Sequence, residues 1–319
     1  DGHWNYFASS GAMKTGWVKD QETWYYLDKD GIMLTGRQDI NGVRYYLNAS
    51  GAMQTGWKWQ DNSWYFYTNS GAMKTGWLKD KESWYYLDPE TGIMAVGSKE
   101  IDGKNYFFSS AGTMQVGWQW SNDSWHYYAT SGALQTGWLK DGDAWYYLEG
   151  KEGVMLVGLH QVDGKQYYFS KSGAMQTGWK WFDNHYRYFE SNGAMKTGWI
   201  KDKGVWYYLN PEDGIMLVGL HKVNGDHYYF DESGAMQTGW KQLDGNWYYF
   251  QADGSLLKNA TTPDGYKVNE EGIWKQAVAA VNSDAVKPEQ KQEANSSIVE
   301  QPKQDSNLEA NASEKKEKE

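Results

Sequence analysis

Pairs of tryptophans seven residues apart recur along the sequence, as in Trp77 and Trp84. Each pair belongs to two short aromatic runs, here residues 76–79 and 83–87, and a polar stretch separates the runs. This pattern predicts a small β-hairpin with the two indoles on facing strands, as neighbouring walls. Electron-rich ring faces attract a cation, and methyl groups on that cation gain apolar contact with the same rings.

A hairpin needs more than two walls to enclose a ligand. Side chains alternate faces along a strand, so Tyr85 points away from Trp84 and Tyr86. We therefore expect the first tyrosine of one hairpin to face back toward the tryptophan pair of the hairpin before it. The second tyrosine of the Tyr-Tyr pair is an alternative third wall.

The hairpin unit repeats with a period of 20 or 21 residues, measured at the glycine that precedes each first strand. These glycines are Gly16, Gly36, Gly56, Gly76, Gly97, Gly117, Gly137, Gly158, Gly178, Gly198, Gly219 and Gly239. A short fixed period predicts an all-β solenoid of stacked hairpins, in which neighbouring units supply the stability that one hairpin lacks.

Two further positions in the repeat support the prediction of stacked hairpins. Several turns between paired strands are Asn-Gly or Asp-Gly, such as Asn41-Gly42, which is a strong hairpin signal. All 11 methionines follow a loop glycine by two residues, as Met94 follows Gly92. This shared place predicts that the methionines pack between hairpins.

The hairpins fall into three classes. KD hairpins share the form G-W-x-K-D and start at Trp17, Trp77, Trp138 and Trp199; WxW hairpins share G-W-x-W and start at Trp57, Trp118 and Trp179. Trp-free hairpins start at Arg37, Ser98, Leu159 and Leu220, with Arg44, Asn105, Gln166 and His227 at the second position. The classes recur about every 61 residues, which predicts three hairpins per superhelical turn, two sides with tryptophan pairs and one side without.

The amino-acid composition excludes or disfavours several kinds of site and partner. The chain has 319 residues, 20 tryptophans, 25 tyrosines and no cysteine, so disulfides and cysteine-based metal sites are excluded. The formal net charge of -10 disfavours nucleic acid as a partner. No apolar run long enough to span a membrane is present, and the first residues match the second half of a hairpin, so we expect further sequence upstream.

The motif G-A-M-x-T-G-W-x-K-D-x-x-x-W-Y-Y-L, which covers residues 71–87, resembles the choline-binding repeat of pneumococcal choline-binding proteins. The resemblance extends over about residues 1–260. It implies a β-hairpin solenoid, secreted and bound to the bacterial cell wall, that holds choline or phosphocholine residues of wall teichoic and lipoteichoic acids. Dimerisation driven by choline is compatible with the resemblance.

The resemblance implies that two tryptophans of one repeat and an aromatic residue of the next form each choline site. Six complete sets result: Trp17, Trp24 and Tyr45; Trp57, Trp64 and Tyr85; Trp77, Trp84 and Tyr106; Trp118, Trp125 and Tyr146; Trp138, Trp145 and Tyr167; and Trp199, Trp206 and Tyr228. Trp179 with Tyr207 departs from the pattern, because Tyr186 replaces the second tryptophan. Trp240 and Trp247 have no ordinary hairpin after them, and only Tyr266 could close that set.

Other residues are interpreted as structural. Trp59, Trp120 and Trp181 are expected to pack or to line a groove, and Asp20, Asp80, Asp141 and Asp202 are expected to form turns. The six histidines show no metal-ligand spacing, and no nucleophile, base and acid recur in a catalytic arrangement. We therefore expect no enzymatic activity, no catalytic residue, no metal and no cofactor.

The sequence divides into a repeat solenoid at 1–259, an atypical terminal repeat at 260–275 and a disordered tail or linker at 276–319, which has no aromatic residue. The leading interpretation is a non-catalytic module that anchors the protein to wall choline. Two alternatives remain: the targeting part of a wall hydrolase whose catalytic domain lies outside this chain, and an α-glucan-binding repeat domain.

Overall fold

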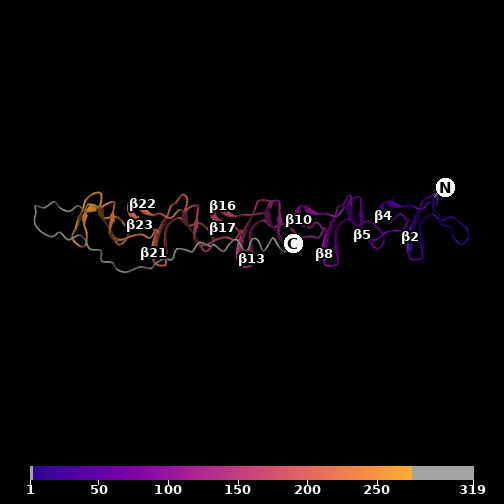
Figure 1. Cartoon of the computed structure of the whole chain (residues 1–319), viewed down its shortest axis with the longest axis horizontal. Helices are drawn as coiled ribbons and strands as arrows, with labels where there is room; N and C mark the ends of the chain where they lie inside the picture. Colours follow the sequence, from indigo (N-terminus) through magenta and orange to yellow (C-terminus); the bar gives the residue numbers. More distant parts are fainter. Residues whose placement is uncertain (1–2, 275–319) are drawn as a thin grey trace, which may run out of the picture. The chain divides into compact units, whose positions relative to one another are not determined.

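The structure, a computed structural model, describes residues 3–274 (Figure 1). Nothing in this range is helical, so no helix that could span a membrane occurs within it. The strands form antiparallel hairpins of five-residue strands almost throughout, which confirms the predicted all-β fold of stacked hairpins. The predicted tail at 276–319 lies outside the described residues.

The chain divides into two compact units. The first comprises the described residues up to Leu139 with Leu148–Met155, and the second comprises Lys140–Tyr147 with the described residues from Leu156 onward. The first unit contains β1 (Gly16–Asp20), β2 (Thr23–Leu27), β3 (Gly36–Ile40), β4 (Val43–Leu47), β5 (Gly56–Gln60), β6 (Ser63–Tyr67), β7 (Gly76–Asp80), β8 (Ser83–Leu87), β9 (Gly97–Ile101), β10 (Lys104–Phe108), β11 (Gly117–Ser121), β12 (Ser124–Tyr128) and β15 (Val154–Met155).

The division between the units falls within β13 (Gly137–Asp141) and β14 (Ala144–Glu149). The second unit continues with β16 (Gly158–Val162), β17 (Lys165–Phe169), β18 (Gly178–Phe182), β19 (His185–Phe189), β20 (Gly198–Asp202), β21 (Val205–Leu209), β22 (Gly219–Val223), β23 (Asp226–Phe230), β24 (Gly239–Leu243), β25 (Asn246–Phe250), β26 (Ala260–Thr261), β27 (Lys267–Val268) and β28 (Ile273–Trp274).

The register of each hairpin decides which side chains share a face. In the β7–β8 pair, Trp77 lies opposite Tyr86, Leu78 opposite Tyr85, and Lys79 opposite Trp84. Because side chains alternate along each strand, Trp77, Trp84 and Tyr86 share one face, and Tyr85 lies on the other. A hairpin with a tryptophan pair therefore offers the pair on one face and its first tyrosine on the opposite face.

The tight turns use residues that tolerate a left-handed backbone. Asn41 and Gly42, between β3 and β4, have φ values of 55° and 78°. Positive φ at both central residues is the requirement of a type I′ turn, whose twist matches that of paired strands. The hairpin prediction from Asn-Gly is confirmed.

The core of the stack is a series of side chains from the fifth position of each second strand. This position is at most 3% exposed in the fully formed hairpins and holds Leu27, Leu47, Tyr67, Leu87, Phe108, Tyr128, Leu148, Phe169, Phe189, Leu209, Phe230 and Phe250. Each hairpin contributes one such residue, so the core is built only when several hairpins stack.

The methionines join successive hairpins, as predicted from their shared position. The backbone N–H of Met53 donates to the Trp24 carbonyl at 2.8 Å, a bond between adjacent hairpins. The Met33 side chain lies over Gly51, where a Cβ atom would stand 2.3 Å from the Met33 sulfur. Gly51 is needed for this contact and for its φ of +79°.

Gly51→Ala is expected to lower stability by about 2–4 kcal/mol, because it combines a strained positive φ with overpacking against Met33. Gly11→Ala is the matched control, since Gly11 has φ +81° but open space around its Cβ position. That control should cost only about 1 kcal/mol. Urea denaturation measures both, and equal losses would show that the methionine contact contributes nothing.

Hairpins of one class lie on the same side within each unit. Figure 1 shows β2 and β8, both from KD hairpins, on one side of the first unit, and β4 and β10, from Trp-free hairpins, on the other. In the second unit, the Trp-free pairs β16–β17 and β22–β23 likewise share a side, away from β21. This placement agrees with about three hairpins per turn.

The last described residues end the stack differently. β24 and β25 join β28, β27 and β26 in a five-stranded sheet, in which Trp247 lies opposite Trp274. Short strands thus replace the ordinary hairpin that would follow Trp240.

Candidate functional site

The first complete predicted set comes together around Trp17. Its ring centroid lies 6.4 Å from that of Trp24, with the planes at 87°, and 4.8 Å from that of Tyr45 on the next hairpin. Tyr26, opposite Trp17 in the hairpin, packs against the same indole at 5.1 Å. Two indoles and a phenol from two hairpins therefore come together, with Tyr26 packed against the first indole.

This aromatic cage recurs with nearly constant geometry. The tryptophan centroids are 6.5, 6.2 and 6.1 Å apart, and the first tryptophan lies 4.8, 4.9 and 4.9 Å from the next tyrosine, in the sets Trp57–Trp64–Tyr85, Trp77–Trp84–Tyr106 and Trp199–Trp206–Tyr228. The structure brings the first tyrosine to the cage. The alternative, the second tyrosine, is not in that place, because Tyr46 stacks on Tyr67 instead.

The cages are open to solvent on one side. Trp24, Trp64, Trp84 and Trp206 are 40–42% exposed, whereas the first tryptophan of each set is half-buried. A closed, interlocked interior would have buried both. The exposed edge leaves room for a ligand to enter from solvent.

The set that lacks a second tryptophan is also assembled. Tyr186 replaces the second tryptophan at 6.5 Å and 87° from Trp179, and Tyr207 lies 5.0 Å from Trp179. Tyr207 is buried, and this burial, followed by the charge of Asp202, raises its pKa, so its phenol stays neutral at physiological pH.

The terminal set closes as the sequence suggested. Trp240 lies 6.5 Å from Trp247 and 5.7 Å from Tyr266. Trp274 packs edge-on against Tyr266 at 5.7 Å. Sequence reasoning missed Trp274 as a neighbour of the terminal cage. Its only sequence signal was its position just before the aromatic-free segment.

Two further sets, Trp118–Trp125–Tyr146 and Trp138–Trp145–Tyr167, stay predictions from the sequence. Within the first unit, Trp118 packs against Tyr127 at 5.2 Å, as the first tryptophans of other sets pack on their own hairpin.

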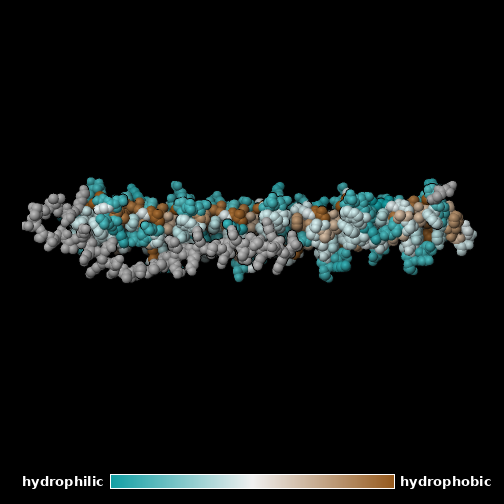
Figure 2. All heavy atoms as spheres, viewed as in Figure 1, coloured by the Kyte–Doolittle hydropathy of each residue, from teal (hydrophilic) through white to brown (hydrophobic). Residues whose placement is uncertain are grey.

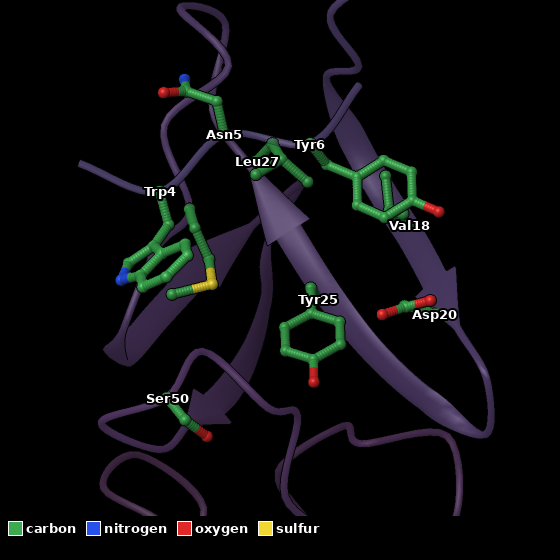
Figure 3. Close-up of a pocket in the computed structure, with 9 residues that line it drawn as sticks. Trp4, Asn5, Tyr6, Val18, Asp20, Tyr25, Leu27 and Ser50 are labelled. Atoms are coloured by element: carbon green, nitrogen blue, oxygen red, sulfur yellow. The ribbon is translucent and has the colours of Figure 1, made fainter. Parts of the chain in front are cut away.

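A cavity of about 400 Å³ near the start of the chain shows which other residues reach a cage (Figure 3). Trp4 corresponds to the second tryptophan of a repeat, Tyr25 is the first tyrosine of the following hairpin, and Met33 and Asp20 also line the space. Met33 donates its N–H to the Trp4 carbonyl at 2.9 Å. Sequence reasoning assigned the methionines only to packing and Asp20 only to a turn.

The Trp-free hairpin at Arg37 fills the equivalent place with its own cation. The Arg37 guanidinium carbon lies 5.0 Å from the ring centroid of Tyr65, and Nη1 donates to the Tyr65 hydroxyl at 2.9 Å. Asp61 forms an ion pair with Arg37. Burial lowers the pKa of Arg37, but the Tyr65 hydrogen bond and the charges of Tyr65 and Asp61 outweigh it, and the net pKa is raised.

Other Trp-free hairpins carry neither cage nor charge at their first position. In the second unit, Val157, Val218 and Leu220 are 48%, 49% and 42% exposed. Figure 2 shows hydrophobic surface where Figure 1 places β16 and β22, amid a mainly hydrophilic visible face. The Trp-free hairpins of the second unit therefore present apolar surface where other hairpins present cages.

The additional tryptophans of the WxW hairpins lie at the cage rim. Trp59, Trp120 and Trp181 are 56%, 47% and 50% exposed, which favours lining over packing. The ring centroid of Trp59 lies 5.5 Å from that of Trp64, so Trp59 extends the wall that Trp64 forms. KD hairpins place lysine there, and the Lys201 ammonium lies 5.6 Å from the Trp206 ring centroid.

Residues 3–274 contain no group of three or more histidines or carboxylates that could hold a metal ion. The repeated feature with defined chemistry in this range is thus the aromatic cage. Its ring faces suit a cation with apolar substituents.

Comparison with protein-family models shows to which family the chain belongs. A family model described as a choline-binding repeat matches residues 1–35, 34–75, 54–98, 95–134, 116–158, 176–219 and 217–260, and one described as a putative cell wall binding repeat matches residues 158–175. The chain belongs to the choline-binding repeat family. This choline-binding repeat protein has its aromatic cages within the matched residues, apart from Tyr266 and Trp274.

Solved structures agree with the family. CbpJ from Streptococcus pneumoniae TIGR4 is 28% identical, with a TM-score of 0.51, over 82% of this chain and all of that chain. Choline binding protein F from Streptococcus pneumoniae is 30% identical over 82% of this chain and 98% of that chain, with TM-scores of 0.50 and, in the presence of a peptidoglycan analogue, 0.52. The comparison with curated protein sequences gives no significant match.

Proposed function

We propose that this choline-binding repeat protein is a non-catalytic module that binds the bacterial cell wall, outside the cell, through choline residues of teichoic and lipoteichoic acids. The observation that carries the proposal is the recurring cage, in which two indoles at 6.1–6.5 Å and a phenol at 4.8–4.9 Å leave one solvent-exposed side. Choline's trimethylammonium group carries charge without hydrogen-bond donors, and ring faces satisfy it.

The residues proposed to contact choline are those of the predicted sets, with the methionine that follows the next hairpin as an additional wall. In the cage of Trp17 and Trp24, this methionine is Met53, which is bonded to the Trp24 carbonyl. Each ring contributes roughly 0.5–2 kcal/mol, which corresponds to millimolar or high micromolar affinity at a single cage.

Weak individual cages suit a polymeric ligand. Each unit contains several cages, and a teichoic acid carries many choline groups. Simultaneous binding raises the apparent affinity by roughly 10²–10⁴ over one cage. A catalytic domain elsewhere in a longer protein would then be carried to the wall by this module.

Free choline at about 50 mM is expected to quench tryptophan fluorescence and to raise the melting temperature by several degrees, because ligand that binds only the folded state stabilises it. Glucose polymers at equal mass concentration serve as the comparison, since α-glucan binding needs several polar groups for the sugar hydroxyls and the cages consist mainly of ring faces. Unchanged melting with choline, or an equal response to glucan, would contradict the proposal.

Wall binding is tested by sedimentation of the protein with purified cell walls that contain or lack choline. We expect sedimentation only with choline-bearing walls, and release by free choline. Solubilisation of wall material by this chain alone would overturn the non-catalytic assignment.

A further inference from the structure

The cages differ in one residue that the next hairpin contributes. The Nε1–H of Trp57 donates to Asp80 at 2.9 Å, and Trp179 donates to Asp202 at 3.1 Å. Trp240 donates to Asp264 at 2.8 Å. In each of these three sets, here called acidic cages, a carboxylate accepts a hydrogen bond from the first indole.

The β-register aims the carboxylate toward the cage. Leu78 lies opposite Tyr85 and Asp80 opposite Ser83, so Asp80 and the cage tyrosine Tyr85 share one face of their hairpin. In the second unit, Trp179 donates to Asp202 and its ring centroid lies 5.0 Å from that of Tyr207, so the carboxylate and the cage phenol both contact the same indole.

The incomplete cage at the start of the chain shows the same combination. Asp20 lines the same cavity as Trp4, Tyr25 and Met33. Figure 3 shows Asp20 and Tyr25 on neighbouring strands of one hairpin, on the side of the cavity. A ligand that contacts the rings there is also close to the carboxylate.

The cages of the KD hairpins have an aliphatic residue in place of the aspartate. Ile101 and Val223, each 4% exposed, belong to core clusters against which Trp77 and Trp199 pack. Ile40, 6% exposed, holds the corresponding position after Trp17. These aliphatic cages offer a cation only ring faces and apolar contact.

We propose that the acidic and aliphatic cages have different ligand preferences: the acidic cages also accept incompletely methylated amines, and the aliphatic cages prefer quaternary ammonium groups. One carboxylate oxygen accepts from the indole, and the aspartate keeps a further oxygen for an ammonium N–H. In an aliphatic cage an N–H turned toward the rings would lose its water without a partner. This inference rests on the proposed function of the cages.

The test uses indole resonances of ¹⁵N-tryptophan-labelled protein, assigned by Trp57→Phe and Trp77→Phe. Trp57 reports an acidic cage, and Trp77 reports an aliphatic cage in the same molecule. Choline, N,N-dimethylethanolamine and ethanolamine are titrated in turn. We expect dimethylethanolamine to bind about tenfold more weakly than choline at Trp77, but within about threefold of choline at Trp57.

Asp80→Asn removes the charge and keeps an amide oxygen that can accept from the Trp57 indole. We expect choline affinity at Trp57 to fall about three- to tenfold, dimethylethanolamine affinity to fall further, and Trp77 to be unaffected. Glu82→Gln is the matched control, because it removes the same charge from an exposed turn residue of the same hairpin and should leave both curves unchanged.

The outcomes separate the two proposals. If both indoles respond to choline but Asp80→Asn leaves the Trp57 curves unchanged, or the two cages rank the amines alike, the carboxylate has no such role and the cages themselves stand. If neither indole responds to choline, the proposed function fails and this inference fails with it.

Discussion

Trp84→Ala is expected to remove one choline site and to leave the stack folded. Trp84 is 42% exposed, and its ring meets Trp77 at 6.2 Å, so truncation opens the cage without emptying the core. Loss of one of three ring contacts should weaken that cage by about tenfold or more. Titration of choline at concentrations that fill the other cages should then show one site fewer.

The control for Trp84→Ala is Leu220→Ala. Leu220 is also 42% exposed and stands at the first position of a Trp-free hairpin, so its truncation removes exposed apolar surface outside any aromatic cage. The number of choline sites should be that of the unaltered protein. If Trp84→Ala also retained the full number, Trp84 would be a packing residue and the cage assignment would be wrong.

Arg37→Trp combined with Arg44→Trp is expected to create a choline site that the protein lacks. Tyr65 already stands in the third-wall position, and the Arg37 guanidinium now occupies the space over its ring, 5.0 Å from the centroid. Replacing both arginines restores the two indole walls and frees that space for a trimethylammonium group. The number of choline sites should increase by one, measured by calorimetric titration.

Arg37→Ala combined with Arg44→Ala is the control, because it removes the same two charges and supplies no rings. Its number of sites should not change. If the tryptophan double variant had an unchanged number of choline sites while its fold was intact by circular dichroism, tryptophan at both positions would not be sufficient to create a choline site.

Much of the fold could be predicted from the sequence, because the information is local and repeated. Asn41-Gly42 specifies a tight turn by backbone sterics, and a period of 20 or 21 residues shows that one unit stacks on the next. Alternation along a strand also selected Tyr45 over Tyr46 as the third wall beside Trp17, and the ring distances agree.

Other features depend on contacts between hairpins. Asp80 has the composition and position of a turn residue, and only the stack brings its carboxylate to the indole N–H of Trp57, 23 residues earlier. Arg37 is a solvated charge in the sequence, but Tyr65 and Asp61 from the following hairpin hold it over an aromatic ring.

The sequence by itself determined the hairpins, their stacking and the pairs of indoles, since turn chemistry, strand alternation and repeat length act within one unit. Only the tertiary structure decided how each cage is completed and whether its last neighbour is a carboxylate or a buried aliphatic side chain. The reason is physical: these partners lie on the facing surface of the next hairpin, and their approach depends on how the two hairpins pack.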